Sequence, residues 1–252
     1  MDNKLHIAIR SYKRAGNVKT LEIFHNGYIW IPESQLNDYL EYYKKDQIIT
    51  IPDDEDGNCP KKNNAILNRC DSDWILILDD DITDICYFEN AEIHSVKYIE
   101  IENIVIHYFQ LAEELGVKLW GMNQNSDPLS YRTYNPVCFL SPILGPCGGH
   151  INTELRYDPD TGTKEDYDFW LQNINKYRKT FRVNKYFYKH YHGSGLSGGL
   201  LGTRSMEYEK KSLNRLQKKW GTKVVRGYGG YGGGKTTENI LNTNVKVPIP
   251  GL

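Results

Sequence analysis

Residues 74–82 read WILILDDDI, five apolar residues followed at once by three aspartates. An unbroken apolar run of this length is typical of a strand buried on both faces, as in the middle of a mostly parallel sheet. In open α/β sheets, ligands bind in the crevice beyond the carboxyl ends of the strands. We therefore expect Asp79, Asp80 and Asp81 at a ligand-binding edge of such a sheet.

Three adjacent carboxylates repel one another unless positive charge lies among them. A divalent cation that carries a diphosphate would supply this charge, because hard cations prefer oxygen ligands. Aspartate also favours helix N-termini, so an acidic helix cap is the competing interpretation. A cap needs only one aspartate, and a run of three after a buried strand favours the metal.

The rest of the chain alternates between strand and helix patterns. Strands are predicted at residues 5–10, 48–51, 74–78, 118–122 and 181–190, and helices at 33–45, 61–70, 99–115, 165–177 and 206–220. Three prolines make residues 134–146 an irregular β region. This alternation argues for an α/β fold with a mostly parallel sheet and helices packed on it. We predict a body at residues 1–203, with a basic helix and Gly-rich tail at 204–252 as part of the same domain.

Composition narrows the class of protein further. Hydrophobic residues make up 39% of the 252-residue chain and charged residues 25%, as in ordinary globular proteins. No apolar run approaches the roughly 20 residues that span a bilayer, and no signal-peptide pattern opens the sequence. We expect a cytoplasmic location. The five cysteines form no CxxC pair, so neither a disulfide framework nor a zinc site is indicated.

Positive charge is concentrated near the C-terminus, although the net charge is only −1. Residues 204–235 carry nine Lys or Arg and two acids. Such a segment could hold nucleic acid, and a solvated helix face is the other interpretation. The candidate DNA contacts are Lys210, Lys211, Lys218 and Lys219.

Four segments occur in the order found in one enzyme family: IAIRSYKRA at 7–15, GNCPKKNNAI at 57–66, DDD at 79–81 and KEDYDFW at 164–170. Together they resemble the family-2-like glycosyltransferases over roughly residues 5–192. The resemblance implies a GT-A, Rossmann-like fold and a nucleotide-sugar donor. The third segment matches the metal-binding Asp-x-Asp of that family. The fourth resembles the Glu-Asp motif that opens its catalytic helix.

A closer resemblance combines EDYDF at 165–169 with HGSGLSGG at 192–199. These motifs are similar to those of the phage TET/JBP-associated glycosyltransferases, described as adding sugars to hydroxymethylated pyrimidines in DNA. The resemblance implies a UDP-sugar donor, Mn²⁺ (or Mg²⁺), a DNA acceptor and, for a phage protein, the host cytoplasm. The alternatives are a glycan, lipid or protein acceptor, a nucleotidyltransferase, and a nucleic-acid-binding module without activity.

The family match also implies roles for the acidic motifs. Asp81 would bind the metal directly, and Asp79 would contact ribose or sugar hydroxyls while helping to hold the metal; Asp80 is grouped with the donor-binding residues. His192 is a candidate third metal ligand, because Mn²⁺ tolerates imidazole better than Mg²⁺ does. A capping or core histidine is the other interpretation of His192. Asp166 is the candidate base that activates the acceptor hydroxyl in an inverting mechanism.

Asp166 has two rivals, Glu165 and Asp168, and all three would also suit a helix N-terminus. On the nucleotide side, Tyr12 could stack on uracil and Asp53 could accept its ring N–H, although both are common surface residues after strands. Arg10 and Lys62 could contact the nucleotide or its phosphates. The GGYGGGKT run at 229–236 has P-loop spacing without the flanking strand and helix, so we interpret it as a lid or anion-binding loop.

Overall fold

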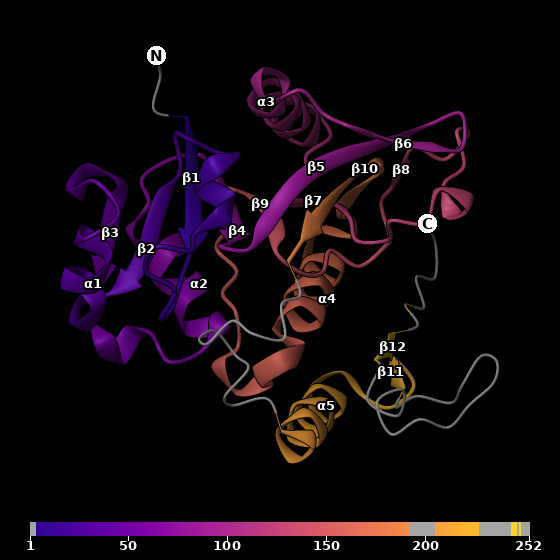
Figure 1. Ribbon diagram of the computed structural model, residues 1–252. Helices are drawn as coiled ribbons and strands as arrows, with labels where there is room; N and C mark the ends of the chain where they lie inside the picture. The colour runs from indigo at the N-terminus through magenta and orange to yellow at the C-terminus, as the bar shows by residue number, and fades with distance from the viewer. Residues whose placement is uncertain (1–3, 192–204, 227–242, 246, 248–252) are drawn as a thin grey trace.

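The computed structural model describes residues 4–191, 205–226, 243–245 and 247 (Figure 1). The main sheet consists of β1 (Leu5–Arg10), β2 (Tyr28–Pro32), β3 (Ile48–Ile51), β4 (Trp74–Asp79), β5 (Ile82–Glu89), β6 (Glu92–Ser95), β7 (Leu119–Asn123), β8 (Val137–Cys138), β9 (Cys147–Ile151) and β10 (Phe181–His190). The α-helices are α1 (Leu36–Leu40), α2 (Cys59–Arg69), α3 (Tyr98–Glu114), α4 (Glu165–Tyr177) and α5 (Met206–Trp220). Strands β11 (Val225–Arg226) and β12 (Asn244–Val245) form a separate small ladder.

The ten-stranded sheet has the order β3-β2-β1-β4-β9-β7-β10-β5-β6, with β8 paired to β10. The pairings place β3, β2, β1, β4, β7, β10 and β6 in one direction, and β9, β5 and β8 in the other. This confirms the predicted fold class, α/β, with a mostly parallel sheet that is flanked by helices.

Strand β4 occupies the buried centre predicted from its apolar run. All five residues before Asp79 are buried. Parallel pairing with β1 runs in register from Leu5 opposite Trp74 to Arg10 opposite Asp79, and antiparallel β9 lies on the other side. The carboxyl ends of β1 and β4 therefore meet at one edge of the sheet.

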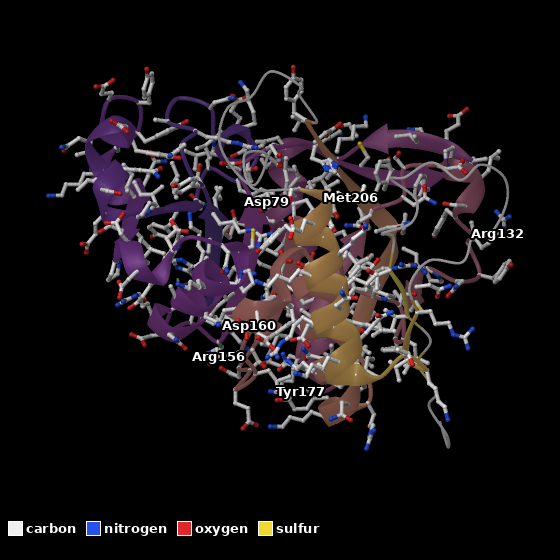
Figure 2. The ribbon with its side chains drawn as sticks, turned by 90° about the horizontal axis from the view of Figure 1, so that it is seen from below. Asp79, Arg132, Arg156, Asp160, Tyr177 and Met206 are labelled. Atoms are coloured by element: carbon white, nitrogen blue, oxygen red, sulfur yellow. The ribbon has the colours of Figure 1, made fainter. Side chains whose placement is uncertain are left out.

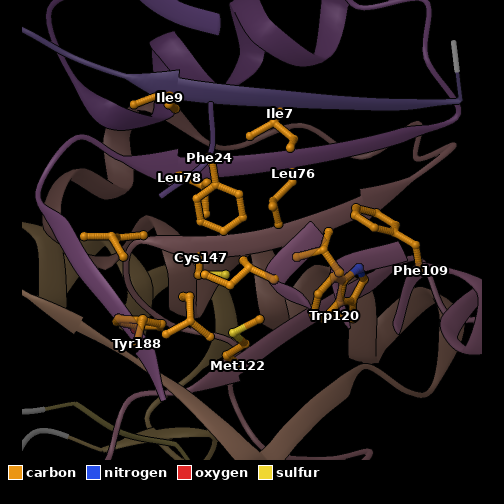
Figure 3. Close-up of a cluster of buried hydrophobic side chains, with 14 of the residues drawn as sticks. Ile7, Ile9, Phe24, Leu76, Leu78, Phe109, Trp120, Met122, Cys147 and Tyr188 are labelled. Atoms are coloured by element: carbon orange, nitrogen blue, oxygen red, sulfur yellow. The ribbon is translucent and has the colours of Figure 1, made fainter. Parts of the chain in front are cut away.

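Helices cover both faces of the sheet, with α3 on one side and α4 on the other (Figure 1). The core on the α3 side contains Phe109 packed edge-on against Trp120, with ring centroids 5.1 Å apart (Figure 3). The opposite core joins apolar residues of α2, α4 and α5 to those of β1, β4 and β7. These two cores hold the N-termini of α2 and α4 beside the carboxyl ends of β1 and β4.

The sequence patterns missed four strands of the main sheet, β2, β5, β6 and β9, and both strands of the small ladder, β11 and β12. Strand β9 reads CGGHI, and glycine weakens strand propensity. A Cβ atom at Gly149 would lie 2.0 Å from Trp120 Nε1, so packing requires this glycine. The predicted helix at 33–45 is α-helical only at Leu36–Leu40, with short 3-10 turns before it and after it.

The triple aspartate does not begin a helix. Strand β5 starts at Ile82, so residues 80 and 81 form a turn between two strands. This contradicts the helix-cap interpretation of Asp79–Asp81. Of the helices within the described residues, none has the length and apolar character needed to cross a membrane.

Candidate active site at the carboxyl edge of the sheet

Arg10 and Asp79 join the ends of β1 and β4. They are register partners, and Arg10 Nε donates a short hydrogen bond to Asp79 Oδ1. Arg10 Nη1 donates to Asn63 Oδ1 of α2 at 2.9 Å. Burial opposes charge on Arg10, but Asp79 outweighs it and raises the Arg10 pKa, so the guanidinium stays charged. The Asp79 side chain is 34% exposed and can still meet a ligand.

Asp80 has a structural role, which corrects its predicted place among the ligand-binding residues. Its side chain is buried, and each carboxylate oxygen has a donor: Arg14 Nη1 for Oδ1 and the Ser11 hydroxyl for Oδ2. Burial raises the Asp80 pKa to about 6, against the opposing effects of Arg14 and Ser11. The carboxylate therefore fixes the loop after β1 and faces away from any ligand.

Asp81 is the more accessible neighbour, with its side chain 21% exposed. Arg14 Nη1 lies 3.3 Å from Asp81 Oδ2, and the backbone N–H of Tyr191 donates to the Asp81 carbonyl at 2.9 Å. The latter bond joins the residue after β10 to the triple aspartate. The predicted ligand His192 lies outside the described residues.

No three acidic, histidine or cysteine side chains converge on one point within the described residues. The available donors are therefore the carboxylate oxygens of Asp79 and Asp81. Mg²⁺ is commonly held by one or two carboxylates together with substrate phosphates, and oxygen donors also suit Mn²⁺. The described donor set fits a cation that arrives with a diphosphate.

The predicted nucleotide residues lie on the loop after β1 and at the start of α2. Lys62 is buried, forms an ion pair with Asp56 at 3.0 Å and donates to the Ser11 carbonyl. Burial lowers the Lys62 pKa, with Asp56 opposing the shift. Lys62 Nζ lies 5.7 Å from the centre of the Tyr12 ring. Lys62 thus positions the Tyr12 loop, and its ammonium is already occupied.

Asp53 is exposed and accepts a hydrogen bond from the Ser34 hydroxyl. Asp56, three residues further on, is buried and was not selected from the sequence. The acidic run DDED at residues 53–56 was the feature of the sequence that could have drawn attention to Asp56. Only the pairing of Asp56 with Lys62 distinguishes it from its exposed neighbours, and that pairing depends on the fold.

Asp166 lies in the first turn of α4, near the same edge. Its Oδ2 accepts the backbone N–H of Gly145 at 2.8 Å, and together with Arg10 it lines a small cavity. Burial raises the Asp166 pKa, while Arg10 and the Gly145 N–H oppose the shift. Burial and the neighbouring charge of Asp166 raise the Glu165 pKa. A carboxylate with a raised pKa is suited to accepting a proton near neutral pH.

The cavity beside Asp166 measures about 20 Å³, enough for roughly one water molecule. Its polar lining includes His150 and Tyr157, whose Nε2 and hydroxyl lie 2.9 Å apart. Burial lowers the His150 pKa to about 4, so the imidazole is neutral. Neither residue was singled out from the sequence, where both occur without a recognisable motif.

Asp168, a predicted rival of Asp166, is fully buried on a different side of α4. It accepts hydrogen bonds from Trp220 Nε1 at 2.7 Å and Lys219 Nζ at 2.9 Å. These contacts attach the end of α5 to α4. Lys219 forms ion pairs with Asp158 and Asp168, and it is exposed, as are Lys210, Lys211 and Lys218.

The structure thus brings Arg10, Asp79, Asp81 and Asp166 to one edge, with Tyr12 on the adjoining loop. The labelled Asp79 marks this edge in Figure 2. Asn63 was missed as a site residue, although it follows Lys62 in the segment that resembled a family motif.

Comparison with known proteins supports the fold. No protein-family model matches the chain, and no curated protein sequence does. A solved structure described as a mycobacterial protein aligns with 85% of this chain and 74% of its own, at 10% identity and a TM-score of 0.53. The CMP:2-keto-3-deoxy-manno-octonic acid synthetase complexed with CTP aligns with 73% of this chain and 91% of its own, at 8% identity. Its TM-score of 0.37 is too low to carry an argument. The first likeness shows a shared α/β fold.

Proposed function

We propose that this chain is a metal-dependent glycosyltransferase that moves a sugar from a UDP-sugar to a hydroxyl group. The favoured acceptor is 5-hydroxymethylpyrimidine in DNA. The observation that carries the proposal is the convergence of Asp79, Asp81 and Asp166 at one sheet edge, with Arg10 between the strand ends and α4. Such an edge is where ligands bind in open α/β sheets.

On the donor side, Asp81 and Asp79 would hold Mn²⁺ or Mg²⁺, and His192 is the proposed third ligand. The cation, when bound, would neutralise charge on the leaving diphosphate. Tyr12 is the proposed stacking surface for the base, held by the Lys62 ammonium.

On the acceptor side, Asp166 accepts the proton of the acceptor hydroxyl. The hydroxyl oxygen forms a bond to the anomeric carbon as the bond from that carbon to the diphosphate oxygen breaks, and UDP leaves with the electron pair. The Gly145 N–H fixes the Asp166 carboxylate in place for this step. An inverting displacement is the proposed course, as the family resemblance implies.

The preference for DNA depends on the family resemblance and on the exposed lysines of α5, Lys210, Lys211 and Lys218. Exposed lysines would contact backbone phosphates without reading sequence. Glycan, lipid and protein acceptors remain alternatives within the same reaction class. A nucleotidyltransferase would instead consume a nucleoside triphosphate and release pyrophosphate.

The direct test is incubation of the protein with Mn²⁺, a panel of UDP-sugars and hydroxymethylcytosine DNA, read by mass spectrometry. A mass gain of one sugar on DNA, with release of UDP, is the expected result. Sugar transfer only to water or to a glycan would show that DNA is not the acceptor. Pyrophosphate release from a nucleoside triphosphate, with no UDP formed, would show that the protein is a nucleotidyltransferase.

Metal binding is tested separately by calorimetric titration of Mn²⁺ in the presence of UDP. Asp81→Asn should weaken Mn²⁺ binding by at least the roughly 10–100-fold seen when mere supporting residues of metal sites are changed. The matched control is Asp71→Asn, an exposed acid before the opposite, amino end of β4. Equal Mn²⁺ affinity in the Asp81 variant and the unmodified protein would remove the triple aspartate from the metal site.

A further inference from the structure

A second polar pocket lies beside β7 and β10, apart from the triple aspartate. It measures about 250 Å³ and is lined by Asn123, Asn125, Ser130, Tyr131, Arg132, Asn135, Arg182 and Asn184. In Figure 2 the labelled Arg132 lies at the right-hand margin of the molecule, away from Asp79. Sites for drug-sized ligands usually measure about 300–1,000 Å³, so this pocket suits a small group.

The lining carries two guanidinium groups and no carboxylate. Arg182 is half-buried, and its Nε donates to Asn184 Oδ1 at 2.9 Å. Within the part of the chain that the structure describes, no acid lies within ion-pair distance of Arg182 or Arg132. Arg132 Nη1 instead donates to two backbone carbonyls. Both side chains therefore retain N–H groups for an incoming anion.

Hydrogen bonds hold the pocket in shape. Asn184 donates from Nδ2 to the Asn135 carbonyl at 3.0 Å, and its backbone N–H donates to Pro136. The side-chain oxygen of Asn123 accepts from the Asn125 backbone N–H at 3.1 Å. Asp127, the nearest acid along the loop, uses Oδ1 to cap the backbone N–H of Leu129. Its charge stabilises the loop and does not pair with either arginine.

Aromatic rings flank the two arginines. Tyr134 is 84% exposed, and Tyr131 is stacked on Phe88 with ring centroids 5.4 Å apart. Proteins that bind single-stranded nucleic acids combine positive groups for the phosphates with aromatic rings on which bases stack. Both components occur here within a few residues of each other.

The pocket is joined to the proposed base by a short path. Asn123 ends β7, and a Cβ atom at Gly145 would lie 2.2 Å from the amide nitrogen of the next residue, Gln124. Gly145 in turn donates its backbone N–H to Asp166. Gln124 and Gly145 thus link the strand end that lines the pocket to Asp166.

We infer that this pocket binds a backbone phosphate of an unpaired nucleic-acid segment, held by Arg182 and Arg132, with a neighbouring base stacked on Tyr134. This assignment rests on the proposed function for its acceptor class. A base must leave the duplex stack to reach an active site, so a binding surface for an unstacked strand on the same molecule is consistent with that reaction.

The test is fluorescence anisotropy of a labelled single-stranded oligonucleotide, without donor or metal, over a range of salt concentrations. Arg182→Gln should weaken binding about tenfold and lower the slope of log affinity against log salt by about 0.7, the value for one lost phosphate contact on a single strand. Arg132→Gln should lower the slope by a similar amount. Because Arg132 lies outside the strands, this substitution leaves the sheet unchanged. The matched control is Arg69→Gln, an exposed arginine paired with Glu55, which should change neither quantity.

Unchanged slopes in both pocket variants would overturn the assignment. So would an unmodified protein that binds inorganic phosphate but no oligonucleotide. Calorimetric binding of UDP with Mn²⁺ separates this outcome from failure of the proposed function. If the protein binds UDP but no oligonucleotide, the transferase proposal stands and the assignment of the pocket is wrong. If the protein binds the oligonucleotide through Arg182 but binds no UDP, the assignment of the pocket stands and the transferase proposal is wrong.

Discussion

The triple-aspartate edge and the Arg182 pocket both collect charged side chains beside the sheet, but they balance that charge differently. At the edge, Arg10 pairs with Asp79, and Arg14 pairs with Asp80 and contacts Asp81. In the pocket, Arg182 and Arg132 have no carboxylate partner among the described residues. The edge therefore carries three carboxylates against two guanidiniums, whereas the pocket carries positive charge alone.

This difference indicates what each site can bind. A slightly negative edge repels a bare diphosphate and requires a cation to bring it in, which agrees with the proposed metal-dependent donor. An uncompensated pair of arginines attracts an anion directly. Under the proposed function, this difference in charge would distinguish donor phosphates from acceptor phosphates. The predictions below test this separation, beginning with the largest effect.

Asp166→Asn should lower kcat by about 10²–10⁴-fold, because it removes the proposed base while keeping the size of the side chain. Oligonucleotide affinity should be unchanged, since the Arg182 pocket is intact. Arg182→Gln should show the reverse pattern, with weakened oligonucleotide binding and UDP binding retained. Steady-state kinetics and anisotropy together measure both halves of this comparison.

Asp71→Asn again serves as the matched acid control and should retain full activity. Activity within a few-fold of the unmodified protein in the Asp166 variant would show that another group takes the proton. Loss of both kcat and oligonucleotide affinity in that variant would mean that the two sites are not independent.

Asp80→Asn should destabilise the fold by about 3 kcal/mol, because it leaves Arg14 without its buried partner. At about 2–4 °C per kcal/mol for a chain of this size, the expected fall in Tm is about 6–12 °C. Asp81→Asn, the adjacent and more exposed acid, should change Tm by far less. Thermal unfolding of the two variants side by side measures the contrast, and equal Tm values would contradict the structural role of Asp80.

The contrast between Asp80 and its neighbours could not be obtained from the sequence. The run of three aspartates after an apolar strand correctly placed all of them at the carboxyl edge. Side chains alternate between the two faces of a strand, which would place neighbouring aspartates on different faces. Residues 80 and 81 form a turn, so this alternation does not apply to them. Asp80 is buried because Arg14 and Ser11, on the loop after β1, bind its carboxylate.

A similar limit applies to the helices and strands. The long helix at Tyr98–Glu114 and the apolar strand β4 were predicted because their patterns are strong and local. Strand β9 was missed because it contains two glycines, and the need for one of them, Gly149, is explained only by the Trp120 ring packed against it. The Arg182 pocket was also missed, since Arg182 and Arg132 are far apart in sequence and become neighbours through the pairing of β10 with β7 and β8.

Lys210→Gln with Lys211→Gln tests whether α5 adds to the positive charge of the pocket. If both lysines contact phosphates, the salt slope for a single strand should fall by about 1.4, twice the value for one contact. The matched control replaces Lys44 and Lys45, an adjacent exposed pair near β3, and should leave the slope unchanged. An unchanged slope in the α5 variant would leave the Arg182 pocket as the main phosphate contact and remove α5 from the DNA-binding surface.

Glu165→Gln should have the smallest effect, because Glu165 is uncharged when Asp166 works. Arg10 and the Gly145 N–H favour the Asp166 carboxylate, so Asp166 ionises first and its charge raises the pKa of buried Glu165 further. Activity should fall as pH drops through the raised Asp166 pKa, above the value of about 4 for an ordinary carboxyl. In the pH profile of kcat/KM, Glu165→Gln should leave this acid limb in place. A shift of the limb to lower pH would mean that Glu165 is charged and that the edge carries more negative charge than its ion pairs indicate.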